Sequence, residues 1–150
     1  MNPFPDTSFL YAVYRSESNS RLADKVLTSL DGSLPVTTLL LLEFRQSVRF
    51  QCWINSRDTA RGFSAKQGEG MLKDLQSDLA SGLLEILPVD WANAHHLAEI
   101  LSARHTVASG HRLVDILHVA TALELGAREF LTFDVNQMQL AKSEGLTVRS

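Results

Sequence analysis

The sequence predicts an α/β fold, a three-layer sandwich with a central parallel sheet of about five strands flanked by helices. Short apolar runs rich in β-forming residues alternate along the chain with segments of helical periodicity, the pattern of parallel α/β proteins. A length of 150 residues with 45% hydrophobic residues suffices for one core. Without a repeat or linker in the sequence, we expect a single domain over residues 1–150.

The first half of the chain predicts two strands and three helices. A short strand is expected at residues 2–5, where Pro3 and Pro5 remove N–H donors from one side only, so that Phe4 and Asp6 can still pair. The next segments are helices with apolar faces, the first of which starts at the capping residue types Thr7 and Ser8. After this first helix we expect a second helix over residues 20–30, which ends in a turn. A strand over residues 34–37 and a long helix from 39 to about 54 should follow.

The second half begins with the most polar and glycine-containing stretch, residues 55–70, which we interpret mainly as a loop. The remaining elements are expected as a helix at 71–79, an edge strand at 84–89, a helix from 91 to about 104, a connector at 107–111, a helix from 113, a strand at 129–133, a helix at 136–143 and a strand at 146–148. Gly126 is placed where the helix from residue 113 should stop.

Composition excludes several classes of protein. The net charge of −3 gives no global basic field, so a nucleic acid would have to meet a local patch. The single cysteine, Cys52, allows no internal disulfide and no cysteine zinc cluster, as expected in a reducing cytoplasm. No apolar run approaches the roughly 18 residues of a membrane span, and the N-terminus lacks signal-peptide features. We therefore expect a cytoplasmic protein without a membrane partner.

Four acidic residues stand in apolar sequence rather than on charged faces. Asp6 and Asp134 each follow a predicted strand, Glu43 interrupts LLLLEF, and Asp115 interrupts LVDIL. Because a buried carboxylate is costly without a partner, and because the carboxyl ends of parallel strands are where ligands bind, these acids indicate a cation site. Each also has a simpler reading: Asp6 and Asp134 as helix N-caps, Glu43 paired with Arg45 or Arg49, and Asp115 paired with Arg112 or His118.

The order of these motifs closely resembles the PIN-domain nucleases, and within them the VapC-type toxins of bacterial toxin–antitoxin pairs. The resemblance covers essentially the whole chain, although the family usually starts with an apolar strand where this sequence has NPFP. It rests on DTSFL at residues 6–10, Glu43 early in an apolar helix, DILHVATAL at residues 115–123 and GAREFLTFD at residues 126–134.

The resemblance implies a five-stranded parallel sheet, a Mg²⁺ or Mn²⁺ site and endoribonuclease activity. It also implies an antitoxin that covers the active groove, and a homodimer. Carried over by position, the acidic cluster consists of Asp6, Glu43, Asp115 and Asp134, with Thr7 or Ser8 and Thr132 as hydroxyl neighbours.

A hard divalent ion held by carboxylates suits phosphodiester cleavage, because it neutralises phosphate charge, activates water and stabilises the leaving oxygen. We expect Asp6 and Asp115 as the main ligands, Asp134 as a second-ion or water-mediated ligand, and Glu43 as the residue that orients or deprotonates the attacking water. His118 is expected beside the cluster as a supporting residue rather than a ligand. Four arginines flank the acids in sequence and could guide the RNA backbone: Arg15, Arg45, Arg49 and Arg112.

Other readings remain open from sequence. His95, His96 and Glu99 have helical metal-ligand spacing, but an exposed helix face explains them better. A PIN-like domain without activity, serving as a binding module, would keep the same fold. A haloacid-dehalogenase-like phosphatase would need a second Asp two residues after the first, where this chain has Ser8.

Overall fold

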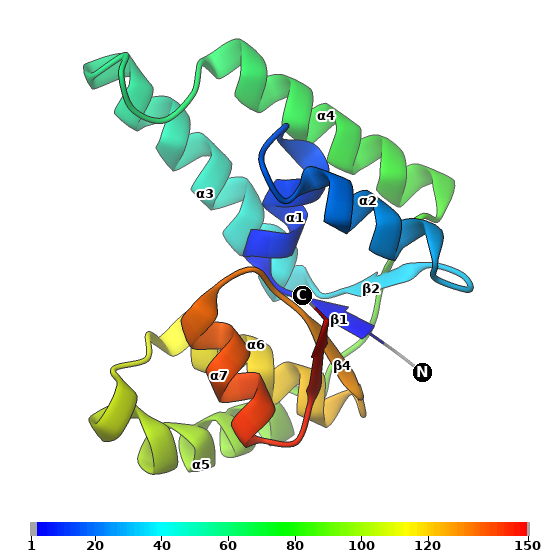
Figure 1. The fold of residues 1–150 in the computed structure, drawn as a ribbon, viewed down its shortest axis with the longest axis vertical. Coiled ribbons are helices and arrows are strands. Elements are labelled where there is room, and N and C mark those ends of the chain that lie inside the picture. Colours follow the sequence, from blue (N-terminus) through cyan, green and yellow to red (C-terminus); the bar gives the residue numbers. More distant parts are fainter. Residues whose placement is uncertain (1–2, 150) are drawn as a thin grey trace. The chain divides into compact units, whose positions relative to one another are not determined.

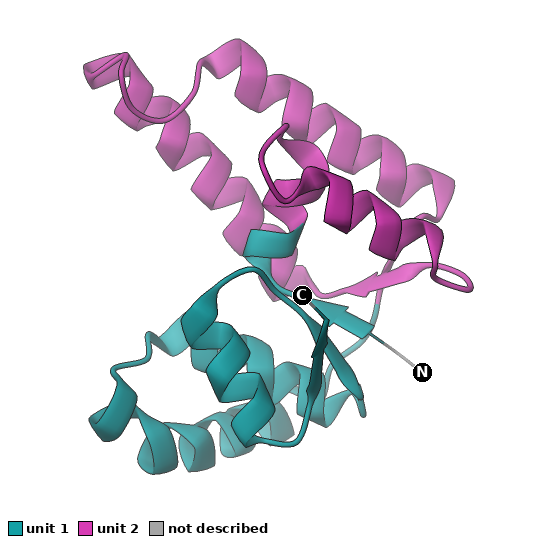
Figure 2. Ribbon diagram, in the orientation of Figure 1, with its two compact units in different colours: residues 1–9, 87–150 teal, residues 10–86 magenta. Residues whose placement is uncertain are grey.

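The structure, a computed structural model, describes residues 3–149 and divides the chain into two compact units (Figures 1 and 2). Unit 1 contains the chain up to Phe9 and from Leu87 onward, and unit 2 contains Leu10–Ile86. Asn2, the first residue of the expected N-terminal strand, lies outside the described residues.

Unit 1 is built on a parallel sheet of three short strands. The strands are β1 (Pro3–Pro5), β4 (Glu129–Leu131) and β5 (Thr147–Arg149), in the spatial order β1-β4-β5. Phe4 pairs with Phe130 in the β1–β4 register, and their rings stack with centroids 6.1 Å apart. Both rings are fully buried, so this pair anchors the β1 side of the sheet.

The prolines of β1 decide which edge of the strand can pair. The Asp6 N–H donates to the Leu131 carbonyl at 3.0 Å, toward β4. Since alternate residues of a strand direct their N–H groups to the same side, Phe4 also faces β4, whereas Pro3 and Pro5 occupy the donor positions of the opposite edge. That edge therefore offers no N–H group between residues 3 and 5, and β1 ends the sheet.

Three helices complete unit 1: α5 (Trp91–Ser109), α6 (Leu113–Glu124) and α7 (Val135–Ser143). Helix α6 packs along α5 and also contacts α7, which in turn contacts β5 (Figure 1). Every residue from 116 to 122 is buried, as in a helix with neighbours on all sides. Its position places Asp115, on the first turn of α6, next to the start of α7.

Unit 2 contains most of α1 (Thr7–Tyr14), together with α2 (Ser20–Thr28), α3 (Thr38–Arg57) and α4 (Ala65–Ser81). Its strands β2 (Leu34–Val36) and β3 (Leu84–Ile86) pair in parallel as a separate two-stranded sheet. Helix α4 packs on α3, and the Tyr14 hydroxyl donates to Asp78 of α4 at 2.6 Å.

The predicted α/β class, the parallel pairing and the flanking helices are confirmed, with one difference in the sheet. The five strands found among residues 3–149 form sheets of three and two strands instead of one sheet of about five. In unit 1 the sheet stops at β1 because Pro3 and Pro5 leave its outer edge without N–H donors. Within the same residues, no helix is long and apolar enough to cross a membrane.

The loop expected at residues 55–70 is wrong at both ends. Helix α3 continues to Arg57, and α4 already begins at Ala65, where the Ser64 hydroxyl caps it by accepting from the Gln67 N–H at 3.1 Å. The connector expected at 107–111 is also shorter, because α5 runs to Ser109 and ends at Gly110.

We predict that Gly68→Ala destabilises the protein by about 1–3 kcal/mol, because the added Cβ would overlap Cys52 Sγ and approach Val48 Cγ1 to 3.3 Å. Gly70→Ala is the matched control in the same helix: nothing lies within 4 Å of its added Cβ, so the gain in helix propensity should stabilise by up to about 1 kcal/mol. Urea unfolding measures both. Equal effects of the two substitutions would contradict a close α3–α4 approach at Gly68.

Candidate active site

Asp6 is buried at the point where β1 ends and α1 begins. Only 2% of the residue is exposed. Its Oδ1 accepts hydrogen bonds from the Ser8 hydroxyl at 2.6 Å and from the Phe9 N–H at 3.0 Å. The second bond is that of a helix N-cap, so the N-cap reading of Asp6 is correct. Its Oδ2 accepts from the Thr132 hydroxyl, which reaches it from the end of β4.

Two hydroxyl groups connect the end of β1 with the end of β4. Thr132 donates to Asp6 and accepts the Asp134 N–H at 3.0 Å. Ser8 donates to Asp6 and accepts the Phe133 N–H at 2.9 Å. The predicted hydroxyl neighbours Ser8 and Thr132 therefore do contact the first acid, and they fix its carboxylate relative to the segment that carries Asp134.

Burial raises the pKa of Asp6 to about 6, because the charged carboxylate loses its hydration. Hydrogen bonds from Ser8, Thr132 and the Phe9 N–H act in the opposite direction, as does the charge of His118. His118 is buried on α6, one turn after Asp115, and interacts electrostatically with Asp6; its supporting role stays a prediction. Near neutral pH the Asp6 carboxylate is thus ionised at a cost that a nearby cation would offset.

Asp134 and Asp115 are linked through one residue of α7, Gln137, by its backbone N–H and its side chain. Asp134 caps α7 by accepting the Gln137 N–H at 2.9 Å, as its N-cap reading expected. The side-chain amide of Gln137 then donates to Asp115 Oδ1, with a nitrogen–oxygen distance of 3.4 Å. A continuous series of hydrogen bonds therefore connects the three predicted acids of unit 1, in the order Asp6, Thr132, Asp134, Gln137 and Asp115.

The sequence analysis did not identify Gln137. It is 3% exposed, and its Oε1 is buried without a hydrogen-bond partner among the described residues. Buried polar atoms are normally paired, so an unpaired carbonyl oxygen beside two carboxylates is an acceptor available to a water or a ligand. Its signal in the sequence was a polar side chain at the third position of a helix, on the face that Leu140 and Ala141 also bury.

Asp115 has a second partner on the solvent side. Arg112 Nε donates to Asp115 Oδ2 at 3.0 Å, so the predicted pairing of these two residues is observed. Arg112 is three-quarters exposed whereas the Asp115 side chain is 15% exposed. A solvent-exposed arginine holds its partner weakly, so Asp115 can exchange this contact for another cation.

The chemistry of the donor set fits a hard divalent ion. The available donors are the carboxylates of Asp6, Asp115 and Asp134, the hydroxyls of Ser8 and Thr132 and the side-chain carbonyl of Gln137. These are oxygen ligands, which Mg²⁺ and Mn²⁺ prefer. Among residues 3–149, no three His, Cys, Asp or Glu side chains already stand as a ligand group. Mg²⁺ retains several waters and binds directly through one or two carboxylates, so the arrangement suits it without such a group.

The remaining predicted residues divide between the two units. The Thr7 hydroxyl in unit 1 is buried without a hydrogen-bond partner among the described residues. Glu43 lies half-buried on α3 in unit 2, where its charge adds to the burial that raises the pKa of Tyr11. The other predicted residues of unit 2 are Arg15, Arg45 and Arg49. The joining of Glu43 to the acids of unit 1 stays a prediction.

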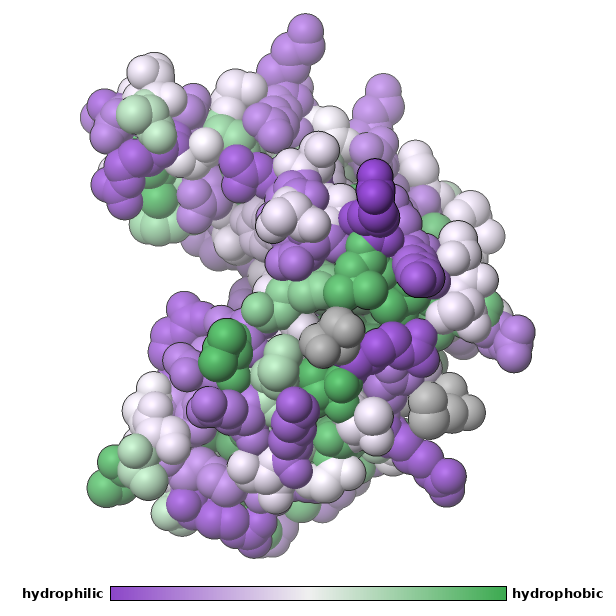
Figure 3. Space-filling model, viewed as in Figure 1, coloured by the Kyte–Doolittle hydropathy of each residue, from purple (hydrophilic) through white to green (hydrophobic). Residues whose placement is uncertain are grey.

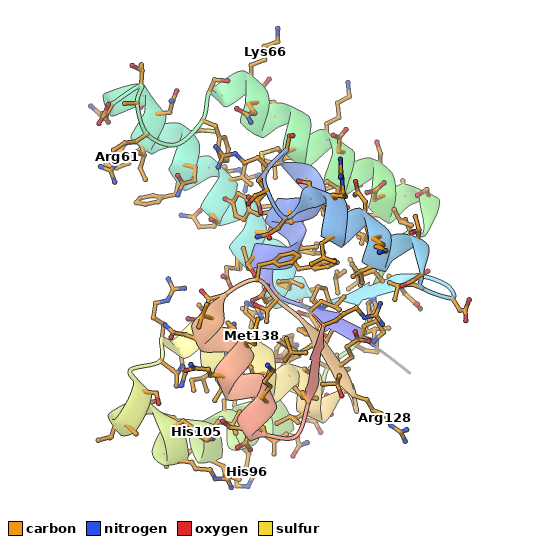
Figure 4. All side chains as sticks on the ribbon, viewed as in Figure 1. Arg61, Lys66, His96, His105, Arg128 and Met138 are labelled. Carbon is orange, nitrogen blue, oxygen red and sulfur yellow. The ribbon has the colours of Figure 1, made fainter. Side chains whose placement is uncertain are left out.

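The histidines and the glutamate with metal-ligand spacing on α5 are solvent-exposed. His95, His96 and Glu99 all lie on the exposed face of α5, and the label in Figure 4 places His96 at the outer surface of that helix. His95 uses its Nδ1 for the Trp91 carbonyl at 2.5 Å. These residues are therefore surface residues, as the simpler reading expected.

Comparison with protein families shows that the PIN domain model matches residues 4–143. The chain belongs to the PIN-domain family. The matched residues include Asp6, Glu43, Asp115 and Asp134, so the resemblance inferred from the sequence is confirmed. Among curated proteins, none matches the sequence.

Solved PIN-domain structures share the fold at low sequence identity. The toxin VapC20 of Mycobacterium tuberculosis, described as cleaving the sarcin–ricin loop, is 17% identical with a TM-score of 0.67 over 99% of this chain and 100% of that chain. VapBC2 of Rickettsia felis, bound to a promoter DNA fragment, is 14% identical with a TM-score of 0.67 over 99% and 98%. FitAcB of Neisseria gonorrhoeae is 16% identical with a TM-score of 0.65 over 99% and 96%.

We predict that Asp6→Asn stabilises the protein above pH 6 by up to about 3 kcal/mol, the free energy that corresponds to the raised pKa. Because folded Asp6 holds its proton up to about pH 6 and the unfolded carboxyl releases it near 3.8, raising the pH through this window lowers the stability of the wild type. The amide retains an acceptor for Ser8 and Phe9.

Urea unfolding from pH 4 to 8 tests this, with Asp90→Asn as the control, since Asp90 is an exposed N-cap of α5. The difference between wild type and Asp6→Asn should grow between pH 4 and 6 and then level off. A variant that is less stable than the wild type at pH 8 would show that Asp6 is not a strained, buried carboxylate.

Proposed function

We propose that the protein is a Mg²⁺- or Mn²⁺-dependent endoribonuclease and the toxin of a toxin–antitoxin pair. The observation that carries the proposal is the hydrogen-bonded series from Asp6 through Thr132, Asp134 and Gln137 to Asp115, at the carboxyl ends of β1 and β4 in a PIN-domain chain. Ligands of parallel α/β proteins bind at this end of the strands.

In this proposal Asp6 and Asp115 hold the metal ion, and Asp134 holds it through water or binds a second ion. The ion would neutralise phosphate charge, lower the pKa of a bound water and stabilise the leaving oxygen. Ser8 and Thr132 keep the Asp6 carboxylate in one orientation, while Gln137 holds Asp115 and offers its free carbonyl oxygen to a water. Glu43, predicted from the sequence, would orient or deprotonate the attacking water.

The comparisons support the proposed substrate and antitoxin, and the homodimer is proposed from the family resemblance. The VapC20 toxin cleaves the sarcin–ricin loop, an RNA element, and VapBC2 bears the name of the toxin class that the sequence resembles. We propose that this chain likewise cleaves RNA in the cytoplasm, that it forms a homodimer and that it binds a cognate antitoxin. Arg112 would contact the RNA backbone once it leaves Asp115.

A catalytically silent binding module is the second candidate. It is favoured by the pairing of Asp115 with Arg112 and by the helix-capping roles of Asp6 and Asp134, which account for these residues without chemistry. The two candidates differ in one measurable respect, which is RNA cleavage that depends on a divalent ion.

We predict that Asp115→Asn lowers Mg²⁺-dependent cleavage of total RNA by at least about 100-fold, because removing even an outer partner of a metal ligand costs 10–100-fold. Asp90→Asn, the same substitution at an exposed N-cap of unit 1, should leave the rate unchanged. Excess EDTA should abolish wild-type cleavage, and added Mg²⁺ or Mn²⁺ should restore it. Equal rates for wild type and Asp115→Asn would favour the silent module or an adventitious nuclease.

We predict that Gln137→Leu lowers the cleavage rate about 10-fold and weakens Mg²⁺ affinity, because Asp115 loses the donor that orients it. Stability should stay the same or rise, since the substitution also removes a buried unpaired oxygen. Gln139→Leu is the matched control, because Gln139 is exposed on the same helix. Mg²⁺ titration by calorimetry and urea unfolding separate the two effects, and an unchanged Mg²⁺ affinity would contradict the positioning role.

A further inference from the structure

The second half of α3 exposes two large aromatic side chains that stack on each other. Phe50 is 51% exposed and Trp53 is 53% exposed. Their ring centroids are 5.6 Å apart with an angle of 19° between the planes. The guanidinium of Arg57 lies 5.5 Å from the centre of the Trp53 ring. With spacings of three and four residues, these side chains form one continuous row along the helix.

The surroundings of this row are cationic although the chain as a whole carries a net charge of −3. Between residues 45 and 61 the sequence has four arginines and a single acid, Asp58. Arg49, Arg57 and Arg61 are exposed, and within residues 3–149 none of them forms an ion pair. The Asp58 carboxylate is engaged locally, since it accepts the Ala60 N–H at 3.0 Å.

Hydrophilic and charged side chains are prominent at this end of unit 2. Figure 3 shows hydrophobic atoms enclosed by hydrophilic ones at the end of unit 2 where α3 leads into α4. Figure 4 shows Arg61 and Lys66 at the same end of unit 2, with Lys66 extended away from the helices. Isolated exposed apolar residues are ordinary, but a stacked pair bordered by unpaired cations has the composition of a binding surface.

We propose that Phe50, Trp53 and Arg57 form a stacking platform for unpaired bases of a single-stranded RNA, with Arg49 and Arg61 on its phosphates. Sites for single-stranded nucleic acid combine aromatic faces for bases with a cationic track for the backbone. The platform rests on the proposed ribonuclease function and adds to it a binding site for unpaired bases on α3. It also explains how an acidic protein binds a polyanion, through a local patch.

Charge decides between RNA and a protein partner for this surface. Protein interfaces are also enriched in aromatic residues and arginine, so the composition of the row does not by itself select the partner. The excess of four arginines over one acid between residues 45 and 61 does, because this uncompensated positive charge is complementary to a polyanion. The position of Arg57 also fits a base as occupant. A cation–π contact at an exposed site contributes less than the stacking of a nucleobase on an aromatic ring, so a base can replace the guanidinium, which is then available to a phosphate.

Binding is measured first without cleavage, in EDTA and at low salt. The probe is a fluorescein-labelled oligoadenylate of about 12 nucleotides, a length within the range of single-strand sites. Fluorescence anisotropy should show Kd values at least about 5-fold higher for Phe50→Ala and Trp53→Ala, as expected for the loss of base stacking. Arg57→Gln should reduce the slope of log Kd against log salt by about 1. Val107→Ala, an exposed apolar residue of unit 1, is the control.

A spectroscopic readout identifies Trp53 itself. In a Trp91→Phe variant Trp53 is the remaining tryptophan, and stacking of adenine on it should quench its fluorescence on titration with the oligoadenylate. In steady-state cleavage with Mg²⁺, Trp53→Ala should raise KM and leave kcat nearly unchanged, because the platform binds substrate and transition state equally.

The outcomes separate the platform from the nuclease. Unchanged Kd, fluorescence and KM in the Trp53 and Phe50 variants would overturn the platform while RNA cleavage by the wild type still stood. Binding that depends on Trp53, without any Mg²⁺-dependent cleavage, would support the platform and contradict the nuclease. If the substitutions instead change the oligomeric state in size-exclusion chromatography with unchanged RNA affinity, the surface is a protein interface and the proposal is wrong.

Discussion

The burial of the Asp6 carboxyl at the end of β1 is the constraint on which the candidate site depends. A second buried acid of the same sheet, Glu129, has an arginine partner, since Arg149 Nε lies 2.6 Å from its Oε1. Asp6 instead accepts hydrogen bonds from two hydroxyls and one N–H group, and an electrostatic interaction with His118 lowers its pKa. Hydroxyls and N–H groups orient a carboxylate but bring no full positive charge, so the pKa of Asp6 remains raised. A site of this kind retains free energy for binding a cation.

The two strand-end acids combine a structural and a proposed functional role. Each caps the helix that follows its strand, which fixes one carboxylate oxygen and with it the direction of the other. Thr132 then connects the two caps, and Gln137 connects the second cap to Asp115. The N-cap reading and the site reading were alternatives in the sequence; the structure shows both N-caps, and capping leaves the proposed site role open to these acids. Placement on caps of two helices gives the site a more rigid support than loop residues would.

Within the site, the sequence was sufficient where a residue type and its place along the chain determine its environment. Acids after two strands of a parallel sheet lie at the same sheet edge, and Asp6 and Asp134 could be named for that reason. Ser8 and Thr132 were implied only by the family resemblance. Gln137 could not be named, because a glutamine in a helix is ordinary until the packing of α6 beside α7 brings it to Asp115. The exposed pair of Phe50 and Trp53 was equally undetermined, since aromatic residues at helical spacing fit a core as well as a surface.

The sequence by itself determined the α/β class, the order of the elements, the parallel pairing, the pairing edge of β1 and the family. The structural features follow from hydrophobic period, capping residues and the missing N–H groups of proline, all of which act between near neighbours in the chain. The family follows from the resemblance of the ordered acidic motifs. Only the tertiary structure decided that α3 and α4 extend through much of the expected loop and that the strands divide into two sheets. For the helices, Gly68 gives the physical reason: its lack of a side chain weakens a helix locally, yet allows α4 to contact Cys52 and Val48 of α3. Packing between distant segments there outweighs local preference.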